Sequence, residues 1–157
     1  KLNGTVTAGN ASGINDGAAA VTLMSSSEAN KRDIHKLVTI RSWASCGVEP
    51  ALMGTGPIPS SKKALELAGW DIKDIDLFEI NEAFSVVPMA AIQDLDLDAE
   101  KVNVYGGAVS LRHPIGASGA RIICTLLNSM TQKSAKLGLA SLCIGGGEAS
   151  SIIVEMI

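Results

Sequence analysis

The sequence predicts a layered α/β domain. Strand-like and helix-like segments alternate along the chain, and the last two segments both resemble strands, which is typical of a sheet flanked by helices. Apolar residues make up 46% of the chain, aromatic residues only 3%, and there are 16 glycines. We therefore expect a core of aliphatic side chains with many glycine-based turns. The 157 residues are long enough for one domain with a sizeable core.

The first part of the chain predicts a strand, a helix and a second strand. Residues 17–25 (GAAAVTLMS) form a short apolar run between turn residues, which is typical of a buried strand, although the alanines leave a helix open. Residues 25–33 are polar and begin with serines, so we expect a short helix with a serine N-cap. Residues 36–45 alternate and are rich in β-branched side chains, which predicts a strand.

Helix and strand signals continue to alternate in the middle of the chain. Residues 61–70 predict a helix that ends at Gly69, and residues 74–80 (DIDLFEI) predict a strand. Residues 81–95 predict a further helix, and Pro88 inside its pattern indicates a kink or a late start. The apolar side chains of this helix form one row: Phe84, Val87, Ala91 and Leu95.

The last third of the chain predicts one long helix and two strands. Residues 117–133 carry an apolar stripe at helical spacing. Residues 137–147 and 149–157 are strand-like runs joined at glycines, so we expect an antiparallel pair.

Composition excludes several classes of protein. The formal net charge is −3, from 13 basic and 16 acidic residues without a dense basic run, so nucleic acid is not an expected partner. No segment approaches about 18 consecutive apolar residues, so we expect no membrane span. The chain begins with KLNGTVTAGNASG and has no initiator methionine, so we expect it to come from the middle of a longer polypeptide.

The three cysteines point away from metal binding. Cys46, Cys124 and Cys143 form no C-x-x-C pair, so we expect neither a zinc site nor a disulfide framework, and no other metal. An odd number of cysteines is typical of a reducing intracellular compartment, and we expect the cytoplasm rather than the mitochondrion.

One histidine lies where the chain makes a tight turn. His113 and a proline precede the small residues 116–119, which favour a turn into a helix. A helix start presents unpaired N–H groups, so His113 would lie beside a place suited to an anion or a developing oxyanion. The alternative is a loop histidine that makes only local hydrogen bonds.

Four stretches combine a reactive or polar side chain with glycine or alanine, and three of them follow a predicted strand. They are NASGINDGAAA (10–20), NEAF (81–84), GGAVSLRHPIGASGAR (106–121) and CIGGGEAS (143–150). Together they resemble the C-terminal part of the thiolase family over essentially the whole chain. The resemblance implies a layered α/β/α domain with a mixed sheet at residues 34–157. It also implies that residues 1–33 are a remnant of the N-terminal domain, comprising its last strand and a short helix.

The resemblance also implies catalytic roles. His113 is expected to activate a cysteine of the N-terminal half and to contribute to an oxyanion hole, and Asn81 is expected to hold a water in the same hole. Without the resemblance, Asn81 would serve equally well as a helix N-cap. Cys143 is expected to move a proton at the α-carbon of acetyl-CoA; taken alone, it would more often be buried packing. Gly145 is expected to donate its N–H in a second oxyanion hole.

Coenzyme A is the substrate that the resemblance implies, and no prosthetic group is expected. Ser12, Ala83 and Phe84 resemble residues that contact its pantetheine arm, although Ser12 alone would be a turn serine. The implied reaction makes or cleaves acetoacetyl-CoA, in a homodimer or homotetramer completed by the N-terminal half of the polypeptide. Cys46 and Cys124 match neither catalytic motif and are assigned to packing. The alternative is a thiolase-like module that binds coenzyme A or lipid, or acts as a scaffold, with lost or reduced activity.

Two residues depart from the family pattern. Arg112 stands where the family usually has glycine, so it could impose a strained φ or suppress the protonation of His113 through its charge. Glu148 adds a carboxylate near Cys143, which would raise the pKa of the thiol if the two are close.

Overall fold

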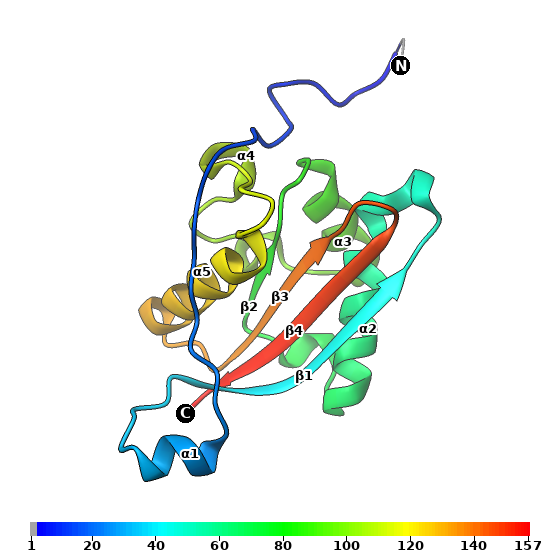
Figure 1. Ribbon diagram of the computed structural model, residues 1–157. Coiled ribbons are helices and arrows are strands. Elements are labelled where there is room, and N and C mark those ends of the chain that lie inside the picture. The colour runs from blue at the N-terminus through cyan, green and yellow to red at the C-terminus, as the bar shows by residue number, and fades with distance from the viewer. Residues whose placement is uncertain (1–2) are drawn as a thin grey trace.

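The computed structural model, which describes residues 3–157, contains a four-stranded mixed sheet flanked by helices (Figure 1). The strands are β1 (Val38–Gly47), β2 (Leu77–Ile80), β3 (Leu137–Cys143) and β4 (Glu148–Met156). Their order across the sheet is β1-β4-β3-β2. β4 is antiparallel to both of its neighbours, whereas β3 and β2 are parallel. The layered α/β prediction, the mixed sheet and the antiparallel pair at the C-terminus are confirmed.

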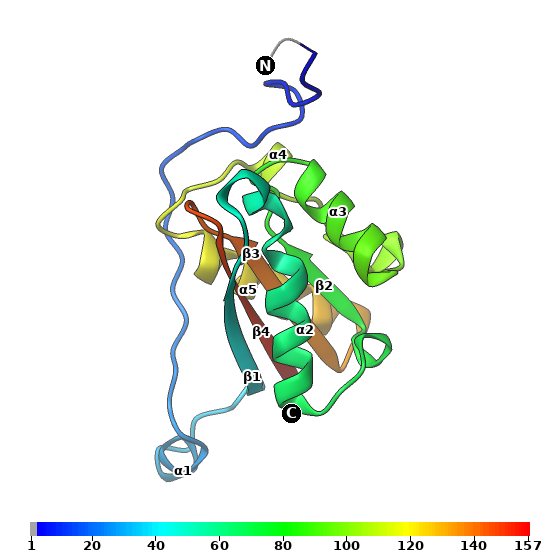
Figure 2. The same ribbon diagram turned by 90° about the vertical axis from the view of Figure 1, so that its right-hand side faces the viewer.

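Helices cover both faces of the sheet (Figure 2). α2 (Pro57–Ala68) and α3 (Val86–Leu95) pack on one face through a core that includes Phe78 and Ile80. α5 (Ser118–Lys133) packs on the other face, where Leu77 belongs to its core. Because successive side chains of a strand point to opposite faces, β2 contributes to both cores.

The N-terminal segment contains the one predicted strand that does not form. Residues 17–25 have no regular secondary structure and run along the outside of α5, with Leu23 70% exposed (Figure 1). No strand of the described chain pairs with this segment, and an unpaired strand cannot satisfy its backbone groups. The short helix that follows is confirmed as α1 (Ser26–Lys31), where Ser25 accepts from the N–H of Glu28 at 3.2 Å.

Two helix starts differ from the sequence pattern, and proline explains both. α2 begins at Pro57 rather than at residue 61, because proline at the first helical position loses no hydrogen bond. It ends at Gly69, as predicted, with φ 71°. α3 begins at Val86, which places Pro88 in its first turn and confirms the late start. Phe84 therefore lies before the helix, and its place in the apolar row was wrong.

Four short helices complete the fold. They are η1 (Pro50–Thr55), η2 (Ile72–Asp74), η3 (Ala99–Lys101) and α4 (Ala108–Leu111). No helix within residues 3–157 is long and apolar enough to cross a membrane. A groove of about 850 Å³ lies between the N-terminal segment, β1 and α5, and none of the predicted site residues lines it.

Candidate active site

Asn81 lies at the end of β2, one residue beyond the strand. Its backbone N–H donates to the carbonyl oxygen of Ser141 on β3 at 2.9 Å, which extends the parallel pairing, and its side chain is buried. The N-cap alternative is wrong, because α3 begins only at Val86 and Ser85 occupies the capping position. The Asn81 amide is therefore available for contacts above the sheet edge.

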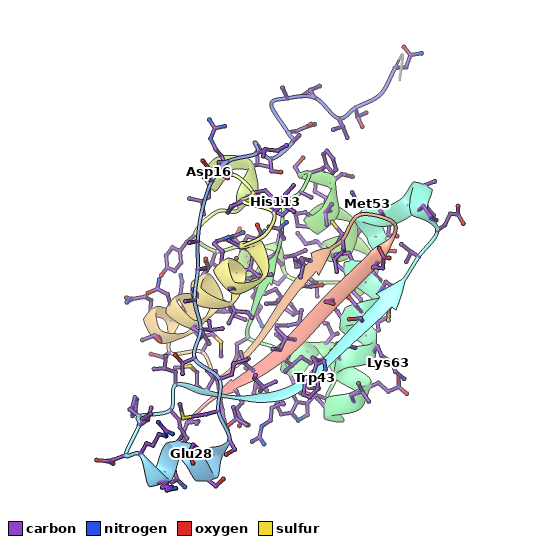
Figure 3. The ribbon with its side chains drawn as sticks, viewed as in Figure 1. Asp16, Glu28, Trp43, Met53, Lys63 and His113 are labelled. Carbon is purple, nitrogen blue, oxygen red and sulfur yellow. The ribbon has the colours of Figure 1, made fainter. Side chains whose placement is uncertain are left out.

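His113 lies in the loop between α4 and α5 and reaches across to β2. Its Nε2 is 3.4 Å from Nδ2 of Asn81, and its Nδ1 is 2.5 Å from Oγ of Ser118. Its backbone N–H donates to the carbonyl oxygen of Gly13 at 2.8 Å. Figure 3 shows His113 at the end of the sheet where the β3–β4 turn lies. The ring thus joins two elements distant in sequence, and the alternative of purely local hydrogen bonds is wrong.

The hydrogen bonds around His113 assign its tautomer. The Ser118 hydroxyl donates to the carbonyl oxygen of Pro114 at 3.0 Å, so it can only accept from Nδ1. On the other side, Arg121 donates to Oδ1 of Asn81 at 3.2 Å, which turns the amide NH₂ toward the ring. Nε2 is therefore the unprotonated nitrogen and accepts from Asn81. In this state Nε2 is a base, and after it takes a proton it becomes a donor.

Burial is the main influence on the His113 ring, and it lowers the pKa of the imidazole. The Arg121 guanidinium lowers the same pKa further, because a nearby positive charge disfavours imidazolium. The cation that acts on His113 is thus Arg121, and the expectation that Arg112 suppresses its protonation was wrong. Both influences keep the ring neutral near pH 7.

The expectation that Arg112 has a strained φ is confirmed. Arg112 has φ 75° and ψ 174°, a region that is open essentially only to glycine. Its side chain is exposed. The turn that delivers His113 to Asn81 therefore requires a strained residue directly before the histidine.

Cys143 is the last residue of β3 and lies at the same end of the sheet as Asn81. It is 6% exposed, and burial raises the pKa of its thiol. Burial accounts for this rise in pKa, and the Glu148 carboxylate is not among its causes. A buried thiol with a raised pKa is protonated at neutral pH.

Gly145 lies in the exposed turn between β3 and β4. Within residues 3–157 its N–H donates to no protein acceptor, so it remains available to a substrate oxygen. A Cβ atom at Gly145 would meet no atom within 4 Å. The tight position is instead Gly147, which has φ 103° and where a Cβ would collide with the carbonyl oxygen of Val48.

The three candidate coenzyme A contacts lie together. The backbone N–H and the hydroxyl of Ser12 both donate to the carbonyl oxygen of Ala83, at 3.1 Å and 2.9 Å. The preceding residue, Ala11, forms an isolated antiparallel bridge with Phe84. Ser12 therefore pairs across the chain with the NEAF segment rather than serving only as a local turn serine.

The remaining cysteines are placed differently from each other. Cys46 is half-buried on β1, which is compatible with packing, whereas Cys124 is exposed on α5, so its assignment to packing was wrong. No group of three His, Cys, Asp or Glu side chains in the described part of the chain could hold a metal ion.

Sequence reasoning missed three residues that touch this site. Ser118 and Arg121 lie in the quoted GASGAR stretch, at the first turn of α5, but their side-chain contacts depend on the helix position. Glu79 lies in the strand LFEI, all of which is buried. A lone charged residue in an apolar strand was a signal, because a buried charge needs a partner.

Comparison with known proteins agrees with this architecture. Residues 34–156 match the family model of the thiolase C-terminal domain, and residues 1–27 match that of the thiolase N-terminal domain. The acetyl-CoA acetyltransferases of Shinella zoogloeoides and Escherichia coli (strain K12) are 59% and 57% identical over 152 residues. In each case the alignment covers 97% of this chain and 39% of the relative.

Solved structures show the same similarity. The crystal structure of the Bacillus anthracis acetyl-CoA acetyltransferase matches with a TM-score of 0.96 and 46% identity, covering 99% of this chain and 39% of that one. Human mitochondrial 3-ketoacyl-CoA thiolase in complex with CoA matches with a TM-score of 0.92 and 38% identity, covering 100% of this chain and 40% of that one. The chain belongs to the thiolase family and spans about two fifths of the length of these relatives.

Proposed function

We propose that this chain supplies the C-terminal part of a thiolase that makes or cleaves acetoacetyl-CoA by moving an acetyl group to or from coenzyme A. The main support for the proposal is the 3.4 Å contact between Asn81 and His113, because this contact lies at the edge of the sheet where β3 ends with Cys143. The names of the acetyltransferase relatives support the acetyl group, and the human thiolase in complex with CoA supports the thioester class.

The proposed chemistry assigns each site residue a step. Nε2 of His113 takes the proton of a nucleophilic cysteine that belongs to the N-terminal half of the polypeptide. As that sulfur attacks the thioester carbon, the carbonyl oxygen becomes negative, and protonated His113 donates to it together with a water held by Asn81. The C–S bond to coenzyme A then breaks, His113 gives its proton to the departing coenzyme A sulfur, and the acetyl group stays on the nucleophilic cysteine. Cys143, in its ionised form, removes a proton from the α-carbon of a second acetyl-CoA, while the Gly145 N–H stabilises the enolate oxygen. The enolate carbon attacks the acetyl-enzyme carbonyl, and the nucleophilic cysteine leaves and takes the proton from Cys143.

Coenzyme A is proposed to lie along the paired segments that contain Ser12, Ala83 and Phe84. This chain would form only one side of that tunnel, and the N-terminal half would complete it. We also propose assembly as a homodimer or homotetramer in a reducing compartment, for which the three free thiols are the support. A binding or scaffold module without activity is not favoured, because similarity to acetyltransferases extends over 97% of the chain.

Complementation tests this proposal. The purified 157-residue chain is titrated with acetyl-CoA and assayed for thiolysis of acetoacetyl-CoA, with and without the N-terminal half as a second chain. We expect no turnover from the chain alone and recovery of coenzyme A binding and turnover on complementation. Turnover without the second chain would contradict the division of roles, and binding without turnover in the complemented protein would support the scaffold alternative.

A further inference from the structure

We propose that Glu79 is a positioning residue for this site: its carboxyl group and the Arg121 guanidinium form a buried pair that orients the Asn81 amide toward the His113 ring. The proposal rests on the proposed function only for the part that His113 plays in the reaction. The contacts themselves are features of this chain and can be tested without turnover.

The Glu79 side chain is 2% exposed and faces α5, like Leu77 two residues earlier on β2. Its Oε2 is 4.0 Å from Nη1 of Arg121. Oε1 of Glu79 and Nε of Arg121 are buried without a hydrogen-bond partner. Burial of a pair with unpartnered atoms costs stability, and apolar residues of similar size would pack there at least as well. The pair therefore points to a role other than stabilising the fold.

A continuous line of contacts leads from Glu79 to His113. The same guanidinium that faces Glu79 donates through Nη2 to Oδ1 of Asn81 at 3.2 Å. Asn81 in turn donates to Nε2 of His113. Thr125 accepts from Nη1 of Arg121 at 3.4 Å and limits its movement. The Arg121 guanidinium contacts both Glu79 and Asn81. The charge on Glu79 therefore affects where the guanidinium lies and how much of its positive charge is compensated.

The charges around Glu79 decide where a proton binds. Burial raises the pKa of Glu79 to about 7; Arg121 opposes this rise, and Glu82, in the loop after β2, adds to it. The one titratable residue of β3, Cys143, packs in the core of the opposite face, and Arg121 is the one charged residue of α5 besides the terminal Lys133. Burial and Arg121 lower the pKa of His113. On acidification, we therefore expect the first proton to bind Glu79 while His113 remains a base.

Nuclear magnetic resonance of the 157-residue chain tests this order of protonation. The chain has two histidines, and His35 is exposed, so it serves as an internal reference. Imidazole and asparagine side-chain signals are followed from pH 5 to pH 9 in the wild type, in Glu79→Gln and in Glu100→Gln, where Glu100 is an exposed control. Glutamine keeps the size of Glu79 and mimics its protonated form.

We expect the wild-type His113 and Asn81 side-chain signals to show an inflection near pH 7, in addition to the lower inflection at which His113 itself is protonated. Glu79→Gln should lose the inflection near pH 7 and keep the lower one, whereas Glu100→Gln should match the wild type. The His35 signals should be the same in all three proteins. A wild-type His113 curve with one inflection would overturn the proposal even if the variant fails to fold. An inflection that persists in Glu79→Gln would also overturn it.

Discussion

A Cβ atom at Gly13 would lie 2.6 Å from Nη1 of Arg112, so the arginine side chain lies directly against the backbone of the N-terminal segment. The next residue, His113, donates its N–H to the carbonyl oxygen of Gly13. These contacts hold the turn before α5 against the N-terminal segment. They also hold Arg112 in its left-handed conformation with φ 75°.

Replacing Arg112 by glycine should stabilise the chain. Residues in this backbone region are strained by roughly 1–3 kcal/mol, and glycine removes that strain, although its flexible unfolded state offsets part of the gain. We expect the free energy of unfolding to rise by about 1 kcal/mol in urea denaturation. Arg112→Ala separates the causes, because it removes the side chain but keeps a Cβ atom, and it should bring no gain.

Leu111→Gly is the matched control for this prediction. Leu111 is the last residue of α4 and is exposed, so glycine there should destabilise the chain by about 0.5–1 kcal/mol. Equal effects of glycine at positions 111 and 112 would show that the conformation of Arg112 carries no strain.

His113→Ala should abolish most of the activity of the complemented enzyme. The variant lacks both the base that activates the nucleophile and a donor to the oxyanion, and loss of one such donor alone costs roughly 10²–10³ in kcat. Steady-state thiolysis of acetoacetyl-CoA measures the loss. His35→Ala, at the exposed histidine, should leave kcat unchanged. Activity of His113→Ala within threefold of the parent would contradict the oxyanion assignment.

Cys143→Ser should separate the two half-reactions. A serine hydroxyl is a much weaker acid than a thiol, so α-proton exchange of acetyl-CoA should slow strongly while the acylation burst persists. Because burial raises the pKa of Cys143, wild-type α-proton exchange should also increase as pH rises above neutrality. Cys124→Ser, at the exposed cysteine of α5, should change neither step. Equal loss of both steps in Cys143→Ser would indicate a structural role for Cys143.

Glu79 should make the stability of the chain depend on pH. Its pKa in the folded chain, about 7, lies above the ordinary value of 4.5, so the folded state binds this proton more tightly than the unfolded state. The stabilisation of the folded chain by this proton is complete below about pH 4.5 and is lost as pH rises through 7. A pKa difference of this size corresponds to about 3 kcal/mol in the free energy of unfolding.

Glu79→Gln should therefore match the wild type near pH 5 and be more stable than the wild type at pH 8.5. Urea unfolding at the two pH values measures the difference, with Glu100→Gln as the exposed control. If Glu79→Gln is less stable than the wild type at pH 8.5, the ionised carboxylate is stabilised by Arg121 more than it is penalised by burial.

Much of the fold follows from short-range signals in the sequence. Ser25 caps α1 and Gly69 ends α2 because each conformation depends on a few neighbouring residues. The alternation of β1 and the glycines between β3 and β4 likewise predicted those strands correctly. The motifs also identified the family and pointed to Asn81, His113 and Cys143, whose catalytic roles stay predictions.

Tertiary structure alone decided what depends on contacts between distant segments. Residues 17–25 have the composition of a strand, but a strand forms only where another strand offers hydrogen-bond partners. The tautomer of His113 depends on Ser118, on Asn81 and, through Asn81, on Arg121. The raised pKa of the Cys143 thiol likewise follows from its burial at the end of β3, in the core beneath α2 and α3, and this burial is set by the folding of the whole chain rather than by neighbouring residues.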